Sequence, residues 1–315
     1  MQVLLTGAAG FIGSQLAERL LAQGESVIGV DSFSPYYDPA LKHRNLEAAL
    51  EHDSFRLVEG DLLELDLAPL VAEADAVLHL AAQPGVRPSW GNEFQIYVND
   101  NVLSTQRLLE AACGSGIDRF VLASSSSIYG EAESFPTTED AVPRPVSPYG
   151  VTKQAAEQLC HLYRVAHGVP SVTLRYFTIF GPRQRPDMAF ARFIDAATEG
   201  RPLKVYGDGG QSRSFTYVDD AVSATIAAAT LGEPGAAYNV AGGSQATVLE
   251  VISILEGLLE REIAVEHEPA VPGDARKTGA DTTAAERDLG FAPQVSLAEG
   301  LARQVDSQAA ARAVG

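Results

Sequence analysis

Val3 to Ser14 reads VLLTGAAGFIGS, and this stretch decides the fold of the 315-residue chain. Its first three residues predict a short buried strand, and the apolar residues that follow recur at helical spacing, at Ile12, Leu16 and Leu20. Three glycines join strand to helix at a G-x-x-G-x-x-G spacing: Gly7, Gly10 and Gly13. The first allows a tight turn, the second lets backbone approach phosphates, and the third lets helix and strand pack closely. The stretch therefore predicts a dinucleotide site at a helix N-terminus.

The second predicted strand, at 27–30, ends in Asp31. A carboxylate about twenty residues past the glycines accepts both hydroxyls of an adenosine ribose and repels a 2′-phosphate. Ser32 and Phe33 follow it and offer no positive charge to such a phosphate. The sequence therefore predicts NAD rather than NADP as the cofactor.

Strands and helices alternate along the first 175 residues. Further strands are predicted at 55–58, 76–80, 119–123 and 172–175, and a long helix over 98–112 crosses back over the sheet. This alternation predicts an α/β fold with a doubly wound parallel sheet (Rossmann) and right-handed crossovers. After Tyr176, prolines and glycines break the chain into short elements, which predicts a smaller, mixed α/β C-terminal domain for the substrate.

The domain boundaries follow from this change of character. We expect residues 1–175, with about 214–240, to form the cofactor domain, and about 176–213 with 241–315 to form the substrate domain. The apolar pattern predicts helices over 215–230 and 248–259. The polar, Ala-rich tail from Ala302 is expected to fray.

A second informative stretch is SPYGVTK, from Ser147 to Lys153. Tyr149 and Lys153 stand four residues apart at the start of a predicted helix, so they share one face. A free tyrosine holds its proton to about pH 10, and a neighbouring ammonium lowers that pKa, which makes Tyr149 a usable proton acceptor. The fifth strand ends in four serines, Ser124 to Ser127, whose hydroxyls face the same crevice.

Other candidates stand near the carboxyl ends of strands, where ligands of such sheets bind. Asp61 follows the third strand and can meet an adenine. His79 lies inside a buried strand and is interpreted as a core residue rather than a catalyst. Asn99 and Asn101 are expected to face the cofactor, with capping or solvent exposure as the alternative. Arg87 either binds an anion or has a surface role.

Composition restricts the partners. A net charge of −18 argues against nucleic acid or an anionic membrane. No apolar run is long enough to span a membrane, and the first strand begins at Gln2, which leaves no room for a signal peptide. Cys113 and Cys160 form no metal-type spacing, so no metal is predicted and a reducing cytoplasm is the simplest location. An anionic substrate needs clustered arginines, and several crowd together: Arg175, Arg183, Arg185, Arg192 and Arg213.

Taken in order, TGAAGFIGS, HLAAQPGVR, ASSSSIYG, SPYGVTK, LRYFTIFGPRQRPDMAF and YGDGGQSRSFTYVDD resemble the extended short-chain dehydrogenase/reductases, and among them the nucleotide-sugar 4-epimerases. The match runs from Met1 to about Gly300. The resemblance implies tightly bound NAD, oxidation of the sugar C4 hydroxyl to a ketone, rotation of the intermediate and return of the hydride to its opposite face. It implies that Tyr149 is the base, Lys153 its electrostatic partner and ribose ligand, and Ser125 the hydroxyl that steadies the sugar oxygen.

Pattern and resemblance together give one set of cofactor-binding residues. They are Gly7, Gly10, Phe11, Ile12, Gly13, Asp31, Ser32, Asp61, Leu62, Leu80, Ala81, Ala82, Asn99, Tyr149, Lys153 and Tyr176.

PGVRPSW and GPRQRPDMAF look more like the UDP-glucuronate 4-epimerases than the UDP-glucose enzymes. The glucose enzymes typically read R-Y-F-N where this chain has RYFT, so Thr178 replaces an amide by a smaller hydroxyl donor. With Ser126 and Ser127, Thr178 is expected to hold a uronate carboxylate without a buried counter-charge.

The nucleotide end of the substrate is assigned to charged residues. Arg185 and Arg213 are expected to bind the UDP diphosphate, with Arg87 as a candidate third and Arg192 in the same set. Asp274 stands where related chains have an acidic residue near the uridine.

The sequence is therefore interpreted as an NAD-dependent epimerase that converts UDP-glucuronate to UDP-galacturonate. One alternative is a UDP-glucose 4-epimerase. Another is a UDP-glucuronate decarboxylase, because the 4-keto uronate is a β-keto acid prone to losing CO2. A non-catalytic NAD sensor is the third, but an intact Ser125, Tyr149 and Lys153 argue against it. The resemblance also suggests a homodimer formed by the helices at about 92–115 and 150–167.

Overall fold

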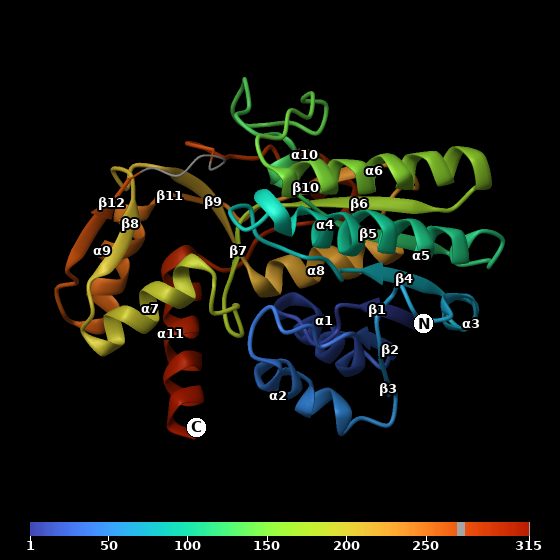
Figure 1. Cartoon of the computed structure of the whole chain (residues 1–315), viewed down its shortest axis with the longest axis horizontal. Coiled ribbons are helices and arrows are strands. Elements are labelled where there is room, and N and C mark those ends of the chain that lie inside the picture. Colours follow the sequence, from blue (N-terminus) through green and yellow to red (C-terminus); the bar gives the residue numbers. More distant parts are fainter. Residues whose placement is uncertain (270–274, 315) are drawn as a thin grey trace.

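A seven-stranded parallel sheet forms the centre of the computed structural model, which describes residues 1–269 and 275–314 (Figure 1). Its strands are β1 (Gln2–Thr6), β2 (Ser26–Asp31), β3 (Phe55–Glu59), β4 (Ala76–His79), β5 (Arg119–Ser125), β6 (Ser171–Tyr176) and β10 (Ala237–Val240). They lie in the order β10-β6-β5-β4-β1-β2-β3, and all neighbours are parallel. The predicted doubly wound fold is confirmed. Its strand order reverses between β1 and β4, where such sheets bind ligands.

Alternating apolar residues on the strands build a core on each face of the sheet. Leu4 of β1 packs in one core with α3 (Leu67–Ala72), α5 (Ser104–Ala112) and α6 (Pro148–His167). Its neighbour Leu5 packs in the other core with α1 (Phe11–Ala22), α2 (Pro39–Leu50) and α8 (Val218–Thr230). Both faces are therefore covered, as a parallel sheet requires.

Shorter elements form a second region beside this sheet, at the left of Figure 1. One sheet joins β11 (Ser244–Thr247), β9 (Ser212–Tyr217) and β7 (Ile179–Phe180), and another pairs β12 (Val265–Glu268) with β8 (Leu203–Tyr206). The helices here are α7 (Ala189–Glu199), α9 (Val248–Leu259) and α11 (Leu297–Val314), whereas α10 (Thr283–Leu289) contacts α8 and β10 at the edge of the large sheet. The helix predicted over 248–259 is confirmed, and a capping box between Thr247 and Glu250 starts it.

Two helix predictions need correction. The helix predicted over 215–230 begins only at Val218, because residues 215–217 pair within β9. The helix predicted over 98–112 is a longer helical run in several pieces. Three-residue η1 (Gly91–Glu93) leads into α4 (Phe94–Tyr97), the π-helical turn η2 (Val98–Leu103) and α5. A second 3₁₀ turn, η3 (Ser126–Ile128), follows β5.

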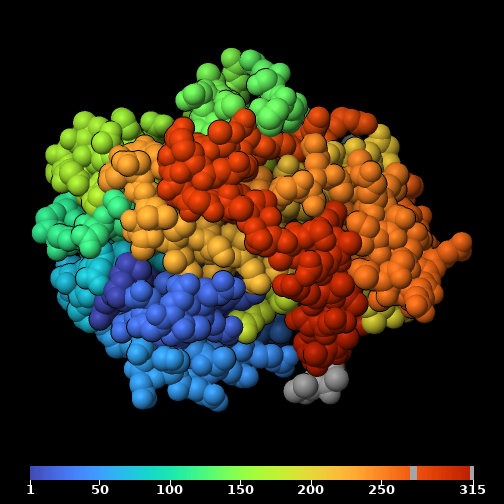
Figure 2. Space-filling view, turned by 180° about the vertical axis from the view of Figure 1, so that it is seen from behind, coloured from blue at the N-terminus to red at the C-terminus, as the bar shows by residue number. Residues whose placement is uncertain are grey.

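The tail does not fray as predicted. It forms α11, which contacts α7, α9 and β9, and Figure 2 shows its red atoms beside the orange atoms of the second region. Leu301 and Gln304 are fully buried. Polar composition concealed this packing, because Gln304 is satisfied inside the protein: its side chain accepts a hydrogen bond from Gly181 N and donates one to Gln184.

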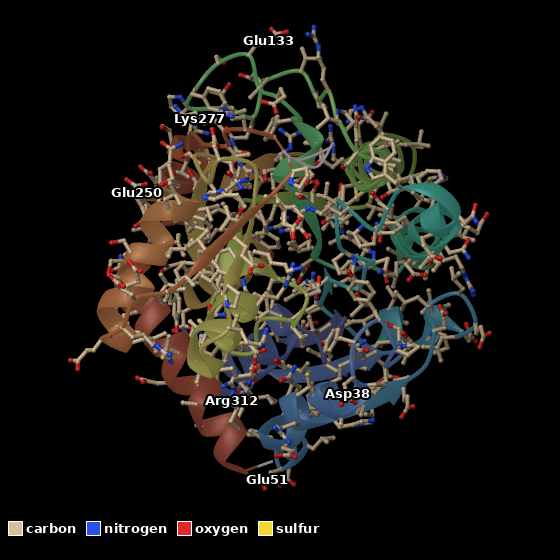
Figure 3. All side chains as sticks on the ribbon, turned by 60° about the vertical axis from the view of Figure 1, so that its left-hand side comes forward. Asp38, Glu51, Glu133, Glu250, Lys277 and Arg312 are labelled. Carbon is tan, nitrogen blue, oxygen red and sulfur yellow. The ribbon has the colours of Figure 1, made fainter. Side chains whose placement is uncertain are left out.

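Many charged side chains lie at the periphery, as Figure 3 shows for Glu51, Glu133 and Glu250. Asp38 has a structural role there, since its carboxylate accepts a hydrogen bond from Ala40 N and caps α2. Within residues 1–269 and 275–314, no helix is both long and apolar enough to span a bilayer.

Candidate active site

The glycine turn after β1 lies against the segment that follows β4. Gly7 has φ +72°, and a methyl group built on it would lie 2.8 Å from Ala81 N. A methyl group at Gly13 would lie 2.1 Å from Gly7 O. Side chains are therefore excluded at both positions, and the backbone at the start of α1 stays bare.

A cavity of about 310 Å³ extends from this turn along the carboxyl ends of the strands. All residues predicted to bind the cofactor line it, except Asn99. His79 lies behind the cavity wall, where it is hydrogen-bonded to Thr6 and Thr105. Burial lowers its pKa to about 3, so its interpretation as a neutral core residue is confirmed.

Asn99 is not brought to the cavity. Its side chain accepts a hydrogen bond from Gln95 on the outer surface, whereas Asp100 and Ser104 line the cavity. The π-helical turn changes which residues face the sheet, and such turns are frequent at functional sites. Burial raises the pKa of Asp100 to about 6.

Asn101 is buried and holds the loop after β4. Its amide oxygen accepts a hydrogen bond from Gln83 N at 2.7 Å, and its amide nitrogen donates to Gln83 O and to Thr152 of α6. Neither of the two roles considered for Asn101 is observed. It joins three segments that build the cavity wall.

Asp31 uses both carboxylate oxygens within the protein. They accept hydrogen bonds from Ala9 N at 3.0 Å and Phe33 N at 2.9 Å, which ties the glycine turn to the end of β2. Lys42 of α2 lies 3.9 Å from the same carboxylate and also lines the cavity. The sequence prediction missed Lys42, because nothing in the polar stretch after Pro35 indicated that this lysine turns inward.

Tyr149 and Lys153 both lie in the first two turns of α6. Ser147 caps that helix by accepting a hydrogen bond from Gly150 N, and Pro148 begins it. Lys153 donates a hydrogen bond to the carbonyl oxygen of Ala123 at 2.9 Å. Burial lowers the pKa of Lys153 to about 8, and the nearby Glu157 carboxylate opposes that shift.

The pKa of Tyr149 was predicted to be lowered by the neighbouring ammonium. This prediction is wrong when only the groups of the protein itself act on the phenol. Burial raises this pKa above its ordinary value, while a hydrogen bond with Ser125 and the positive charge of Arg185 act in the opposite direction. The ring of Tyr97 packs edge-on against Tyr149 at a centroid distance of 6.3 Å. A buried phenol therefore needs positive charge close by before it can lose its proton.

The four serines at the end of β5 and in η3 divide between two environments. Ser124 donates to the buried carboxylate of Glu157, away from Ser126 and Ser127. Ser125 donates to the hydroxyl of Ser127 and accepts from its backbone N–H, both at 3.1 Å. Ser126 and Ser127 occupy η3, and half-buried Thr178 follows the neighbouring strand β6.

Sequence reasoning also missed Glu157, which anchors a buried polar network. Its carboxylate pairs with Arg175 at 2.9 Å, and their side chains are 8% and 9% exposed. Arg175 in turn donates to the hydroxyl of Tyr129 and the carbonyl of Glu139. The network fixes the ends of β5 and β6, and Arg175 is therefore a structural residue.

The predicted substrate arginines lie in different surroundings. Arg185 lines the first cavity, pairs with both oxygens of Asp187 at 3.0 Å and lies over the ring of Tyr36. Arg87 stacks on Tyr206 of β8, with 4.1 Å between its guanidinium carbon and the ring centroid.

Two further residues, Arg213 and Asp274, were predicted to bind the substrate. Arg213 donates to the carbonyl of Ser212 in β9. Asp274 lies outside the described residues.

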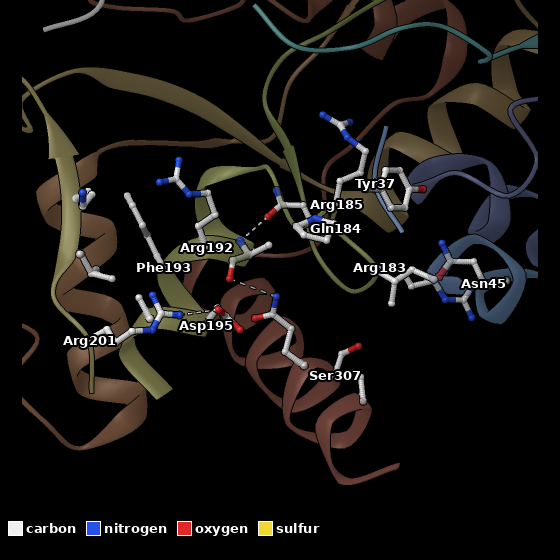
Figure 4. A pocket seen from close by; sticks show the side chains of 18 of the residues that line it. Tyr37, Asn45, Arg183, Gln184, Arg185, Arg192, Phe193, Asp195, Arg201 and Ser307 are labelled. Atoms are coloured by element: carbon white, nitrogen blue, oxygen red, sulfur yellow. Dashed lines mark hydrogen bonds and ion pairs between the residues drawn. The ribbon is translucent and has the colours of Figure 1, made fainter. Parts of the chain in front are cut away.

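A second cavity, of about 580 Å³, adjoins the first at Tyr37 and Arg185. Figure 4 shows Arg192 and Phe193 of α7 and Ser307 of α11 on one side, with Arg183 and Asn45 on the other. The only carboxylate among its lining residues within the described chain is Asp195, which pairs with Arg201 and Arg312. This cavity suits an anionic ligand. No cluster of possible metal ligands occurs in the part of the chain that the structure describes.

Comparison with known proteins identifies the family. Residues 3–241 match the NAD dependent epimerase/dehydratase family. The chain is 44% identical to YtcB of Bacillus subtilis (strain 168), described as an uncharacterized UDP-glucose epimerase, over 97% of each chain. It is 43% identical to the UDP-glucuronic acid 4-epimerase from Bacillus cereus, solved with UDP-glucuronic acid and NAD; the TM-score is 0.96, with 99% and 100% of the chains covered.

MoeE5 is a third similar protein. It is 42% identical in the complex with UDP-glucuronic acid and NAD, with a TM-score of 0.89 and 99% and 100% of the chains covered. It was also solved with UDP-glucose and NAD. The chain therefore belongs to the NAD dependent epimerase/dehydratase family, and it is an extended short-chain dehydrogenase/reductase of the nucleotide-sugar 4-epimerase type.

NAD, the predicted cofactor, is the cofactor of this family. The cavity fits it, because the bare backbone of the glycine turn leaves amide groups for a pyrophosphate. Asp31 and Lys42 stand at one end of the cavity, where they would meet the adenosine ribose, and Tyr149 and Lys153 stand at the other.

Proposed function

We propose that this enzyme epimerises UDP-glucuronate at C4 to give UDP-galacturonate. The observation that carries the proposal is that Tyr149 and Lys153 line the cofactor cavity together, with Ser125 hydrogen-bonded to Tyr149. The similarity to the Bacillus cereus UDP-glucuronic acid 4-epimerase over nearly the whole chain supports the choice of sugar.

In this mechanism Tyr149 takes the proton of the C4 hydroxyl and later returns it. Bound NAD supplies the hydride acceptor and then the hydride donor. Ser125 donates a hydrogen bond to the same sugar oxygen, and Lys153 stabilises the phenolate. Because burial raises the Tyr149 pKa, the positive charges of Lys153 and Arg185 are needed to make it a base near neutral pH.

The substrate is held at both of its anionic groups, the uronate carboxylate and the diphosphate. Thr178, Ser126 and Ser127 donate hydrogen bonds to the uronate carboxylate at the carboxyl ends of β5 and β6. The second cavity, with Arg185 and Arg192, supports a diphosphate on the side next to α7. Arg87, which stacks on Tyr206 of β8, and Arg213 of β9 complete the group.

UDP-glucose is a second candidate substrate, because MoeE5 was solved with both UDP-sugars and YtcB is described as a UDP-glucose epimerase. The test is to incubate the purified enzyme with UDP-glucuronate and with UDP-glucose, separate the epimers and measure released CO2. Conversion of UDP-glucuronate alone supports the proposal. Preferred conversion of UDP-glucose would contradict it, and stoichiometric CO2 would indicate a decarboxylase.

A homodimer in the cytoplasm completes the proposal. Apolar side chains are exposed on the outer faces of the helices at 94–103 and on α6: Phe94, Ile96, Leu103, Val151, Leu162 and Val165. Such a patch on neighbouring helices is suited to a second copy of the chain. Light scattering should give twice the 33.3 kDa of the chain; the mass of a monomer at micromolar concentration would contradict the dimer. The domain boundaries at about 176, 214 and 240 are part of the same proposal.

A further inference from the structure

A buried ammonium lies beside the carboxylate that faces the adenosine end of the cavity. Lys42 is 6% exposed and its Nζ lies 3.9 Å from Asp31 and 3.2 Å from the hydroxyl of Ser34, to which it donates a hydrogen bond. The same Nζ lies 5.0 Å from the ring centroid of Tyr37. All four residues line the cavity, so the ammonium is part of the nucleotide site.

The two charges are close without a direct hydrogen bond between them. At 3.9 Å the contact is at the outer limit of an ion pair, and both side chains are only 8% exposed. In such an environment the charges act strongly on each other and on a ligand. Burial lowers the pKa of Lys42, and the charge of Asp31 opposes that shift.

We propose that Asp31 and Lys42 together determine the preference for NAD over NADP. The carboxylate repels a 2′-phosphate, and it also neutralises the charge of a lysine that would otherwise bind that phosphate. Without the Asp31 charge, the Lys42 ammonium and the hydroxyls of Ser32 and Ser34 supply the donors that a phosphate monoester needs. Removal of the Asp31 charge alone would therefore allow the site to bind NADP. The inference rests on the nucleotide cavity and not on the identity of the sugar.

The test is an equilibrium competition on the full chain loaded with NADH. NADPH is added, free and bound nucleotides are separated by ultrafiltration, and both are quantified by ion-exchange chromatography. Asp31→Asn keeps the side-chain shape and an oxygen acceptor for one backbone amide. It should raise the affinity for NADPH relative to NADH by about ten- to a hundredfold, the range for a hydrogen bond to a charged group.

The double variant Asp31→Asn/Lys42→Met decides between the two residues. Most of the gain in NADPH affinity should disappear, because methionine fills the space of the lysine without its charge. If the double variant retains the gain, Lys42 takes no part and the proposal is wrong. Lys277→Met, at an exposed lysine that does not line the cavity (labelled in Figure 3), is the matched control and should leave the relative affinities for NADH and NADPH unchanged.

A third variant covers the case in which Asp31→Asn does not fold, since Asp31 also accepts hydrogen bonds from Ala9 and Phe33. Lys42→Met in the wild-type background leaves the carboxylate without its counter-charge. The preference for NADH over NADPH should then increase about tenfold. An unchanged preference would overturn the proposal. Because the readout is nucleotide binding, an error in the sugar assignment would not affect this result.

Discussion

Glu157→Gln is expected to destabilise the protein while keeping nearly the same side-chain shape. The carboxylate accepts hydrogen bonds from the guanidinium of Arg175 at 2.9, 3.2 and 3.3 Å and one from Ser124. An amide in its place keeps one acceptor and turns its NH2 group toward a buried guanidinium. Breaking a buried ion pair from one side costs about 3–5 kcal/mol. Glutamine retains part of the bonding, so we expect about 3 kcal/mol.

The measurement is urea-induced unfolding at a fixed, saturating NAD concentration, because a ligand that binds the native state adds to its stability. The matched control is Glu299→Gln, which removes the partner of Arg303 in an exposed pair of α11 and should leave stability unchanged. A double variant, Glu157→Leu with Arg175→Met, removes both buried charges and should recover most of the loss. Equal stability of Glu157→Gln and Glu299→Gln would refute the argument.

The same variant has a second effect, on the pH dependence of turnover. Burial lowers the pKa of Lys153 to about 8, and Glu157 is the group that raises it. Lys153 stabilises the phenolate only while it is protonated, so turnover should decline as pH rises through about 8. Without the Glu157 charge the Lys153 pKa falls, and this alkaline limit should move to lower pH. A limit that stays in place would show that Glu157 acts on stability alone.

Three further predictions concern the reaction. Tyr149→Phe keeps the edge-on packing with Tyr97 and should preserve folding while lowering kcat by about 10²–10⁴-fold; near-normal kcat would exclude Tyr149 as the base. Thr178→Val should lower kcat/KM for UDP-glucuronate by about ten- to a hundredfold and change kcat/KM for UDP-glucose little. Equal losses on both sugars would show that Thr178 only packs against the pocket. Asn101→Ala leaves the backbone of Gln83 without its partner and should weaken NADH binding measured by the same competition; unchanged binding would mean that other contacts hold the loop after β4.

Most residues predicted to bind the cofactor line one cavity because they lie next to strand ends. Gly7, Asp31 and Tyr176 each lie at or just past the carboxyl end of a strand, and the apolar pattern locates those ends. Strand order then brings these ends together without further information. Family resemblance supplied the roles of Tyr149 and Lys153, whose spacing alone is too common to be specific.

The errors arose where tertiary structure overrides local pattern. Asn99 was predicted to face the cofactor, but Asp100 lines the cavity instead, because a π-helical turn alters the facing by about one residue. The Tyr149 pKa was argued from one neighbouring charge, whereas burial is the larger effect. Lys42 lies in α2, and no local signal shows that its ammonium approaches Asp31. Such features depend on what surrounds a residue rather than on its neighbours in sequence.

The buried side chain of Gln304 has a consequence for protein synthesis. The Gln304 side chain accepts a hydrogen bond from Gly181 and donates one to Gln184. Gln184 in turn accepts a hydrogen bond from the backbone amide of Ala191 at the start of α7. The loop that carries Arg183 and Arg185 is therefore held in place by hydrogen bonds to a residue more than a hundred positions later in the chain. All strands of the large sheet leave the ribosome before this fastening can occur. A growing chain can thus assemble its nucleotide cavity early, but it completes the arginine side of the second cavity only after residue 304 has emerged from the ribosome.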